Sequence, residues 1–143
     1  MPETYAREIT GVDSVPSTKS DGGLQGGRIR RFRATVDMDG QAIADTVVLA
    51  DVPPGYAFAY GVITASATLG ATATLAIGVS GSAAKYRAAA VLTSANTPTL
   101  FGTAAGASAD ALTDGERVIA TVAAAALPDS TGYFVVDLYY SAP

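Results

Sequence analysis

The sequence has no cysteine, no histidine and no tryptophan among its 143 residues. Without cysteine and histidine, the chain has no disulfide, no thiol nucleophile, no imidazole base and none of the usual ligands of zinc or haem. Charged residues make up 15% of the chain, whereas about a quarter is typical of globular domains. The composition removes the commonest catalytic classes, and we expect no enzyme activity, no cofactor and no bound metal.

Long apolar runs are also missing. No stretch reaches the roughly 18 consecutive apolar residues of a membrane-spanning helix, and Glu3 and Glu8 near the start argue against a signal peptide. The net charge is −4, with an excess of basic residues in 1–33 and of acidic residues in 34–143. We therefore expect no membrane partner and no direct binding of nucleic acid.

Residues 1–27 show neither a helical nor a strand period. They contain Pro2 and Pro16, scattered polar residues and the glycine-rich stretch 22–27. That stretch lacks the Lys and Ser or Thr of a phosphate-binding loop, so we interpret it as a flexible hinge. Two interpretations of residues 1–27 stay open: a disordered tail, or an extended arm that becomes ordered on a neighbouring subunit.

From residue 28 the pattern changes to that of a β-sheet protein. Phe32, Ala34, Val36 and Met38 alternate with polar residues, which predicts a half-buried strand. Similar patterns, separated by turn signals rich in glycine, proline and aspartate, predict further strands near residues 43–49, 56–63, 72–79, 97–101, 117–124 and 133–140. The alanine-rich segment 83–92 fits either a short helix or a strand.

About eight short strands in one body predict an all-β fold. The number and spacing suit a jelly-roll-like β-sandwich made of residues 28–143 and preceded by an extended N-terminal arm at 1–27. In the segment 56–63, simple alternation places Tyr56, Phe58 and Tyr60 on one face of a strand.

Two groups of residues are candidates for protein contact. The basic cluster at 28–33 either guards a sheet edge or contacts an acidic neighbouring subunit. In the last strand both faces are apolar or aromatic, which indicates that one face packs on the core and the other on a partner. The candidate contact residues are Arg28, Arg30, Arg31, Arg33, Tyr133 and Tyr139.

Two further patterns have ordinary explanations or remain alternatives. Asp37 and Asp39 resemble the start of a calcium loop, but Ala42 and Val48 stand where that loop needs glycine and glutamate. A β-turn at 39–40 explains these two aspartates.

The aromatic residues of segment 56–60 are the compact candidates for a sugar-binding platform, so a carbohydrate-binding β-sandwich stays open as an alternative function.

Several stretches together resemble a known group of proteins. They are 31–41 (RFRATVDMDGQ), 52–56 (VPPGY), 85–89 (KYRAA), 97–102 (TPTLFG) and 133–140 (YFVVDLYY). With these stretches the chain resembles small structural proteins of tailed bacteriophages, over roughly residues 28–141. These are turn and strand patterns, and none is a catalytic signature.

The resemblance implies a virion component, and specifically a head decoration or cement protein. Such proteins lie on the outer surface of the phage head, commonly form trimers, and contact the major capsid protein. Assembly would take place in the host cytoplasm. Other virion roles, in the tail, the head–tail joint or the fibre base, are alternatives of the same class.

Overall fold

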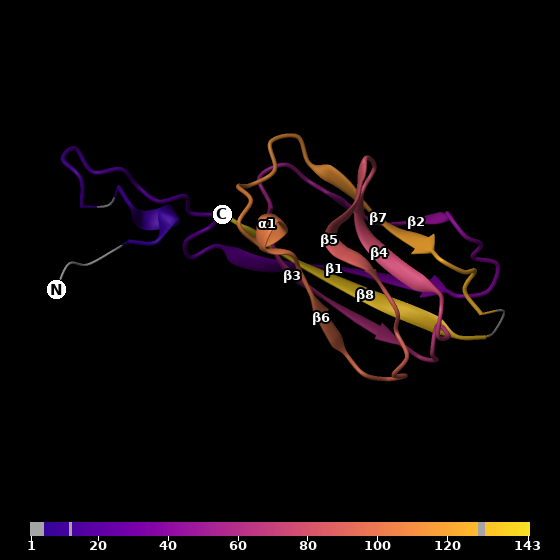
Figure 1. Ribbon diagram of the computed structural model, residues 1–143. Coiled ribbons are helices and arrows are strands. Elements are labelled where there is room, and N and C mark those ends of the chain that lie inside the picture. Colours follow the sequence, from indigo (N-terminus) through magenta and orange to yellow (C-terminus); the bar gives the residue numbers. More distant parts are fainter. Residues whose placement is uncertain (1–4, 12, 129–130) are drawn as a thin grey trace.

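The computed structural model describes residues 5–11, 13–128 and 131–143, and the strands of this part form two stacked antiparallel sheets (Figure 1). The first sheet contains, in spatial order, β1 (Arg28–Asp37), β8 (Tyr133–Ala142), β3 (Ala57–Ala65) and β6 (Thr99–Phe101). The second contains β2 (Thr46–Val52), β7 (Glu116–Ala123), β4 (Thr74–Val79) and β5 (Ser82–Ala90). Two short helices complete the elements, the 3₁₀ helix η1 (Arg7–Ile9) and α1 (Ala104–Ala107).

The strand order is that of a jelly roll. The first half of the chain pairs with the second half in reverse: β1 with β8, β2 with β7, β3 with β6 and β4 with β5. Rolling such a double ribbon brings β3 beside β8 and β4 beside β7, which completes the two sheets. The predicted all-β jelly-roll-like sandwich is confirmed, and the ambiguous segment 83–92 is largely strand, in β5.

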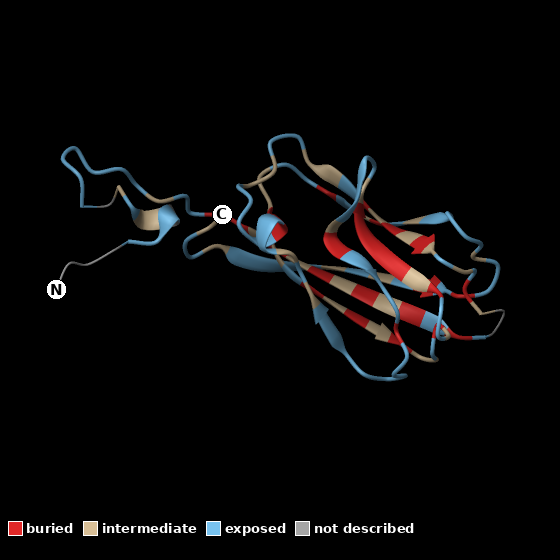
Figure 2. Cartoon of the chain, in the orientation of Figure 1, coloured by how far each residue is buried: buried red, intermediate tan, exposed pale blue. Residues whose placement is uncertain are grey.

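The core lies between the two sheets. In β8, Phe134, Val136 and Leu138 are buried and alternate with side chains that point outward, as the period-two pattern predicts. The second sheet contributes inward residues such as Ile77 and Val118. Figure 2 shows this buried layer in red, on strands of both sheets.

The predicted common face of Tyr56, Phe58 and Tyr60 is wrong. The pairing of β3 with β8 shifts register between Phe58 and Tyr60. An extra residue of this kind is a β-bulge, which reverses the direction of the following side chains. Phe58 is therefore buried at 5% exposure, whereas Tyr60 is 42% exposed on the opposite face.

The short strand β6 lies at the edge of its sheet, as the sequence predicts for 97–101. Its Phe101 lies opposite Gly61 of β3, and the ring fills the space above that glycine. A Cβ atom at position 61 would lie 2.1 Å from the ring. The absence of a side chain at Gly61 is thus what lets Phe101 pack there.

The N-terminal segment projects away from the sandwich, as Figure 1 shows for its described part. Among the described residues, the hydrogen bonds of residues 5–20 stay within that segment, for example the bond from the Tyr5 hydroxyl to Asp13. The stretch 21–27 instead meets the body, where the Ser141 hydroxyl donates to the Gly23 carbonyl at 2.6 Å. The division into an arm at 1–27 and a body at 28–143 stays a prediction.

Candidate protein-contact surface

The outward face of the first sheet carries two of the predicted arginines and both predicted tyrosines. Along β8 this face holds Tyr133, Val135, Asp137 and Tyr139, because the residues between them are buried in the core. Arg31 of β1 lies opposite Tyr139, and Arg33 lies opposite Asp137. We refer to the first sheet as sheet A and to this surface as the sheet A outer face.

An aromatic pair stands at its centre. The rings of Tyr60 from β3 and Tyr139 from β8 are stacked, with centroids 4.6 Å apart and an interplanar angle of 16°. Next to them, Leu100 of the edge strand β6 is 71% exposed. Aromatic side chains with one apolar face available are enriched at protein interfaces.

Ion pairs border the aromatic pair on the side of β1. The Arg33 Nε donates to Asp137 Oδ1 at 3.0 Å and its Nη2 to Oδ2 at 3.2 Å, while the Arg31 Nε lies 3.9 Å from the same carboxylate. The hydrogen bond to Asp137, together with the charge of that carboxylate, raises the pKa of Arg33. The forked geometry holds Arg33 against Asp137 of the neighbouring strand. The side chains of Arg31 and Arg33 stay 50% and 52% exposed, which leaves them partly available to an acidic partner.

The other two arginines lie on the opposite side of β1. Arg28 and Arg30 pair with Ala142 and Tyr140, which are both buried and face inward. Both arginines are nevertheless exposed, since they stand at the end of the strand. The cluster predicted as one unit is therefore split between two faces.

Tyr133 lies on the same sheet A outer face as Tyr139 but far from the aromatic pair. The two residues are six positions apart in an extended strand, a distance of about 20 Å. Tyr133 is 46% exposed, near the other end of β8. Tyr60, which stacks on Tyr139, and the exposed Leu100 beside Tyr60 were not among the predicted contact residues. Their placement depends on the bulge in β3 and on the pairing of β6.

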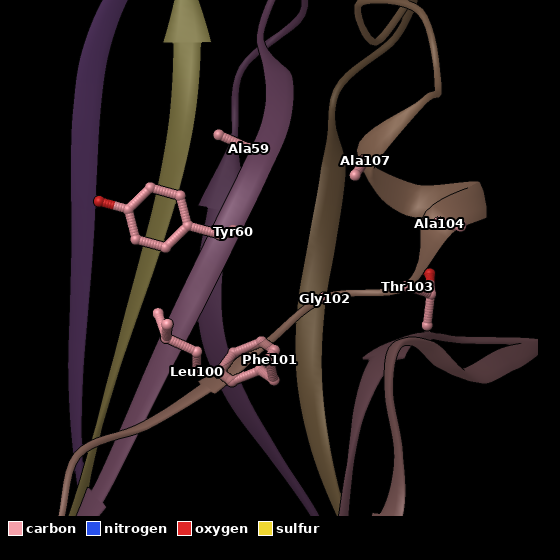
Figure 3. A pocket seen from close by; sticks show the side chains of 8 residues that line it. All are labelled: Ala59, Tyr60, Leu100, Phe101, Gly102, Thr103, Ala104 and Ala107. Carbon is pink, nitrogen blue, oxygen red and sulfur yellow. The ribbon is translucent and has the colours of Figure 1, made fainter.

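A groove opens beside the aromatic pair, between β6 and α1 (Figure 3). It has a volume of about 420 Å³, and none of its lining residues is charged: Ala59, Tyr60, Leu100, Phe101, Gly102, Thr103, Ala104 and Ala107. The Thr103 hydroxyl fixes the short helix beside it. It donates to the Lys85 carbonyl at 2.6 Å and accepts from the Gly106 amide at 3.0 Å.

A second polar feature lies inside the sandwich and was not foreseen from the sequence. Glu116 of β7 accepts hydrogen bonds from the hydroxyls of Tyr86 and Tyr140, the latter at 3.2 Å, and forms an ion pair with Lys85. Its side chain is only 11% exposed. The carboxylate thus joins β8 of one sheet to β5 and β7 of the other.

The cluster around Glu116 has a structural role, because its hydrogen bonds link the two sheets. Burial raises the pKa of Tyr140, and the charge of Glu116 and the hydrogen bond to it act in the same direction. The phenol therefore remains a protonated donor to the carboxylate. A buried polar group with all its partners stabilises one specific packing of the sheets.

Sites of other kinds were also sought among residues 5–11, 13–128 and 131–143. No group of three acidic side chains there is placed to hold a metal ion. Neither helix of this part has the length and apolarity that a membrane span requires.

Comparison with known proteins gives a result at the level of the fold. No protein-family model matches the chain, and no curated protein matches it. A chain from the capsid asymmetric unit of cyanophage Pam1 matches with a TM-score of 0.71 and 22% identity over 100% of both chains.

Two further capsid structures contain similar chains. One is the capsid of Ralstonia phage GP4, with a TM-score of 0.65, 19% identity and coverage of 92% of this chain and 94% of the other. The second is the acid-stable capsid of Helicobacter pylori bacteriophage KHP30, with a TM-score of 0.53, 13% identity and coverage of 81% and 94%. The jelly-roll body is therefore a fold that chains in phage capsid structures share.

Proposed function

We propose that this protein is a structural component of a phage virion and that it decorates the outside of the head shell. The observation that carries the proposal is the end-to-end match of its fold with a chain of the cyanophage capsid asymmetric unit. A fold by itself does not define a function. The composition adds support, since a chain without cysteine and histidine and with few charges suits a packing role better than a catalytic one.

The proposed mechanism is repeated burial of surface across the joints of the shell. Each copy contributes a modest interface, and the lattice makes the contacts multivalent, which raises the total affinity without new chemistry. The sheet A outer face is the proposed contact surface for the major capsid protein or for further copies of this chain. Association as a homo-oligomer, with a trimer as the state that the resemblance implies, belongs to the same proposal.

Binding to purified head shells that lack this protein tests the proposal. We expect saturable binding at a simple fraction of the number of major capsid subunits, and greater resistance of the shells to heat. A copy number of about one per hundred capsid subunits would instead indicate a joint or tail component. Absence of binding, with shells of unchanged stability, would overturn the proposal.

The structure does not form the aromatic platform on which the carbohydrate-binding alternative was based. That platform consisted of Tyr56, Phe58 and Tyr60, and the bulge in β3 places Phe58 between the sheets, away from Tyr60. Tyr56 is only partly exposed and contacts Phe32.

A further inference from the structure

The groove between β6 and α1 continues a surface on which this chain already packs. Ala59 and Ala107 line the groove, and both also line a neighbouring hollow of about 220 Å³. In that second hollow, Leu24 and Gln25 of the N-terminal segment contribute to the lining. The chain's own segment thus lies along one half of a continuous depression, and the other half is open.

The outer part of the N-terminal segment has the complementary character. Val15 is 99% exposed, the most exposed of the large apolar side chains in the described part of the chain. It belongs to the uncharged run 14–18, Ser-Val-Pro-Ser-Thr. Removing an exposed valine from water is favourable, and residues 5–20 make no described hydrogen bond to their own body.

We propose that the run 14–18 of one copy docks in the groove between β6 and α1 of a second copy. The six residue steps from Val15 to residue 21, where the segment begins to meet its own body, span up to about 20 Å, and Figure 1 shows this part of the chain leading away from the sandwich. An uncharged, partly apolar segment then meets a lining without charges.

This inference deepens the proposed function and rests on it, because it names a second copy of the chain as the partner of the arm. Since the native chain has no cysteine, paired single-cysteine variants can test it directly. Val15→Cys protein is mixed with Leu100→Cys protein, one of them carrying a mass label, under mild oxidation. We expect a disulfide between unlike chains, detected by mass after non-reducing electrophoresis.

A matched control uses Val48→Cys in place of Leu100→Cys. Val48 is 52% exposed and lies on β2 of the other sheet, away from the groove. Equal yields of mixed disulfide with Leu100→Cys and Val48→Cys would overturn the inference. A double variant Val15→Cys, Leu100→Cys that closes its disulfide within single chains would overturn it as well.

A second measurement separates this inference from the proposed function. Val15→Asp, which places a charge on a fully exposed residue, should fold normally and lower the average mass of the oligomer in light scattering. An unchanged mass would contradict the docking. Because that assay uses no shells, failure of the wild-type protein to bind shells would remove the decoration role and leave the contact between copies standing.

Discussion

Tyr139 and Tyr140 are neighbours in β8 and occupy opposite chemical environments. Tyr140 is fully buried, meets Phe32 and Phe58 edge to face at 5.7 and 5.5 Å, and donates its hydroxyl to Glu116. Tyr139 lies on the sheet A outer face and stacks on Tyr60. The same type of side chain therefore packs in the core at position 140 and lies on an outer face, where a partner can contact it, at position 139.

The fold divides its aromatic side chains between the interior and one outer face. Aliphatic side chains such as Ile77 and Val118 fill much of the sandwich. Two groups of aromatic rings are in contact, one around Glu116 inside the sandwich and the pair of Tyr60 and Tyr139 outside. The inner group has every polar partner it needs within the chain. The outer group has packing surface that its own chain leaves uncovered, which is the property expected of an interface.

The largest expected effect separates the two tyrosines by stability. Tyr140→Ala removes a buried ring and leaves Glu116 with one donor fewer, so the free energy of unfolding should fall by about 3–5 kcal/mol. Tyr139→Ala should cost less than about 1 kcal/mol, since this side chain is only partly buried and substitutions outside the core cost little. Urea unfolding of both variants measures the difference, and equal losses would erase the distinction.

The buried carboxylate gives the next effect. Glu116→Gln keeps the shape of the side chain but removes its charge, so Lys85 loses its ion pair and the two tyrosines lose a strong acceptor. We expect a loss of about 1–3 kcal/mol in the free energy of unfolding. The exposed pair of Asp51 and Arg117 is the control, and Asp51→Asn should change thermal stability much less.

A substitution at Gly61, the residue after Tyr60, should reduce stability by a similar amount. Gly61→Ala places a methyl group into the Phe101 ring, so β6 must shift. Overpacking of this kind costs about 1–3 kcal/mol. The double variant with Phe101→Ala should regain part of the loss in thermal denaturation, because the methyl group then has room. No recovery would mean that the clash lies elsewhere.

Much of the fold could be predicted from the sequence, because strands with one buried face carry a period-two pattern. That pattern placed the strands near 117–124 and 133–140 and the faces of Phe134 and Val136 correctly. It failed at Phe58 and Tyr60, since a bulge in β3 depends on the pairing of the neighbouring strands. Glu116 could not be assigned for the same reason, since its partners Tyr86 and Tyr140 come together only when the ribbon is rolled.

The candidate surface was predictable only in part. Arg31, Arg33 and Tyr139 do share a face, as the alternation around them indicates. Arg28 and Arg30 point to the other side, where they stay exposed only because they stand at the end of the strand. The period-two pattern of a strand can thus assign a residue to one face of the sheet. Whether that residue is buried depends on where the opposing sheet ends.

The outer aromatic pair should affect binding and leave stability nearly unchanged. Tyr60→Ala and Tyr139→Ala should each weaken binding to head shells or self-association by tenfold or more if the pair is a central contact. Val48→Ala, a similarly exposed apolar residue on the other sheet, should bind like the wild type. Sedimentation of the variants with shells measures both, and equal binding by all three variants would remove the sheet A outer face from the proposal.

The smallest effect concerns an exposed ion pair, the external counterpart of Lys85 and Glu116. Hydrogen bonds from Arg117 to Asp51, at 2.7 and 3.1 Å, lower the pKa of Asp51. A carboxyl whose pKa is lowered in the folded state adds stability above its unfolded pKa, and this stability is lost as the pH falls through the folded pKa.

In NMR titration, Arg117→Ala should return the pKa of Asp51 towards that of a free aspartate. Salt should move it the same way in the wild type, because exposed charges are screened by counterions. If neither change moves the titration midpoint of Asp51, the Asp51–Arg117 pair is not formed in solution. Of these two ion pairs, only the buried Lys85–Glu116 pair would then remain.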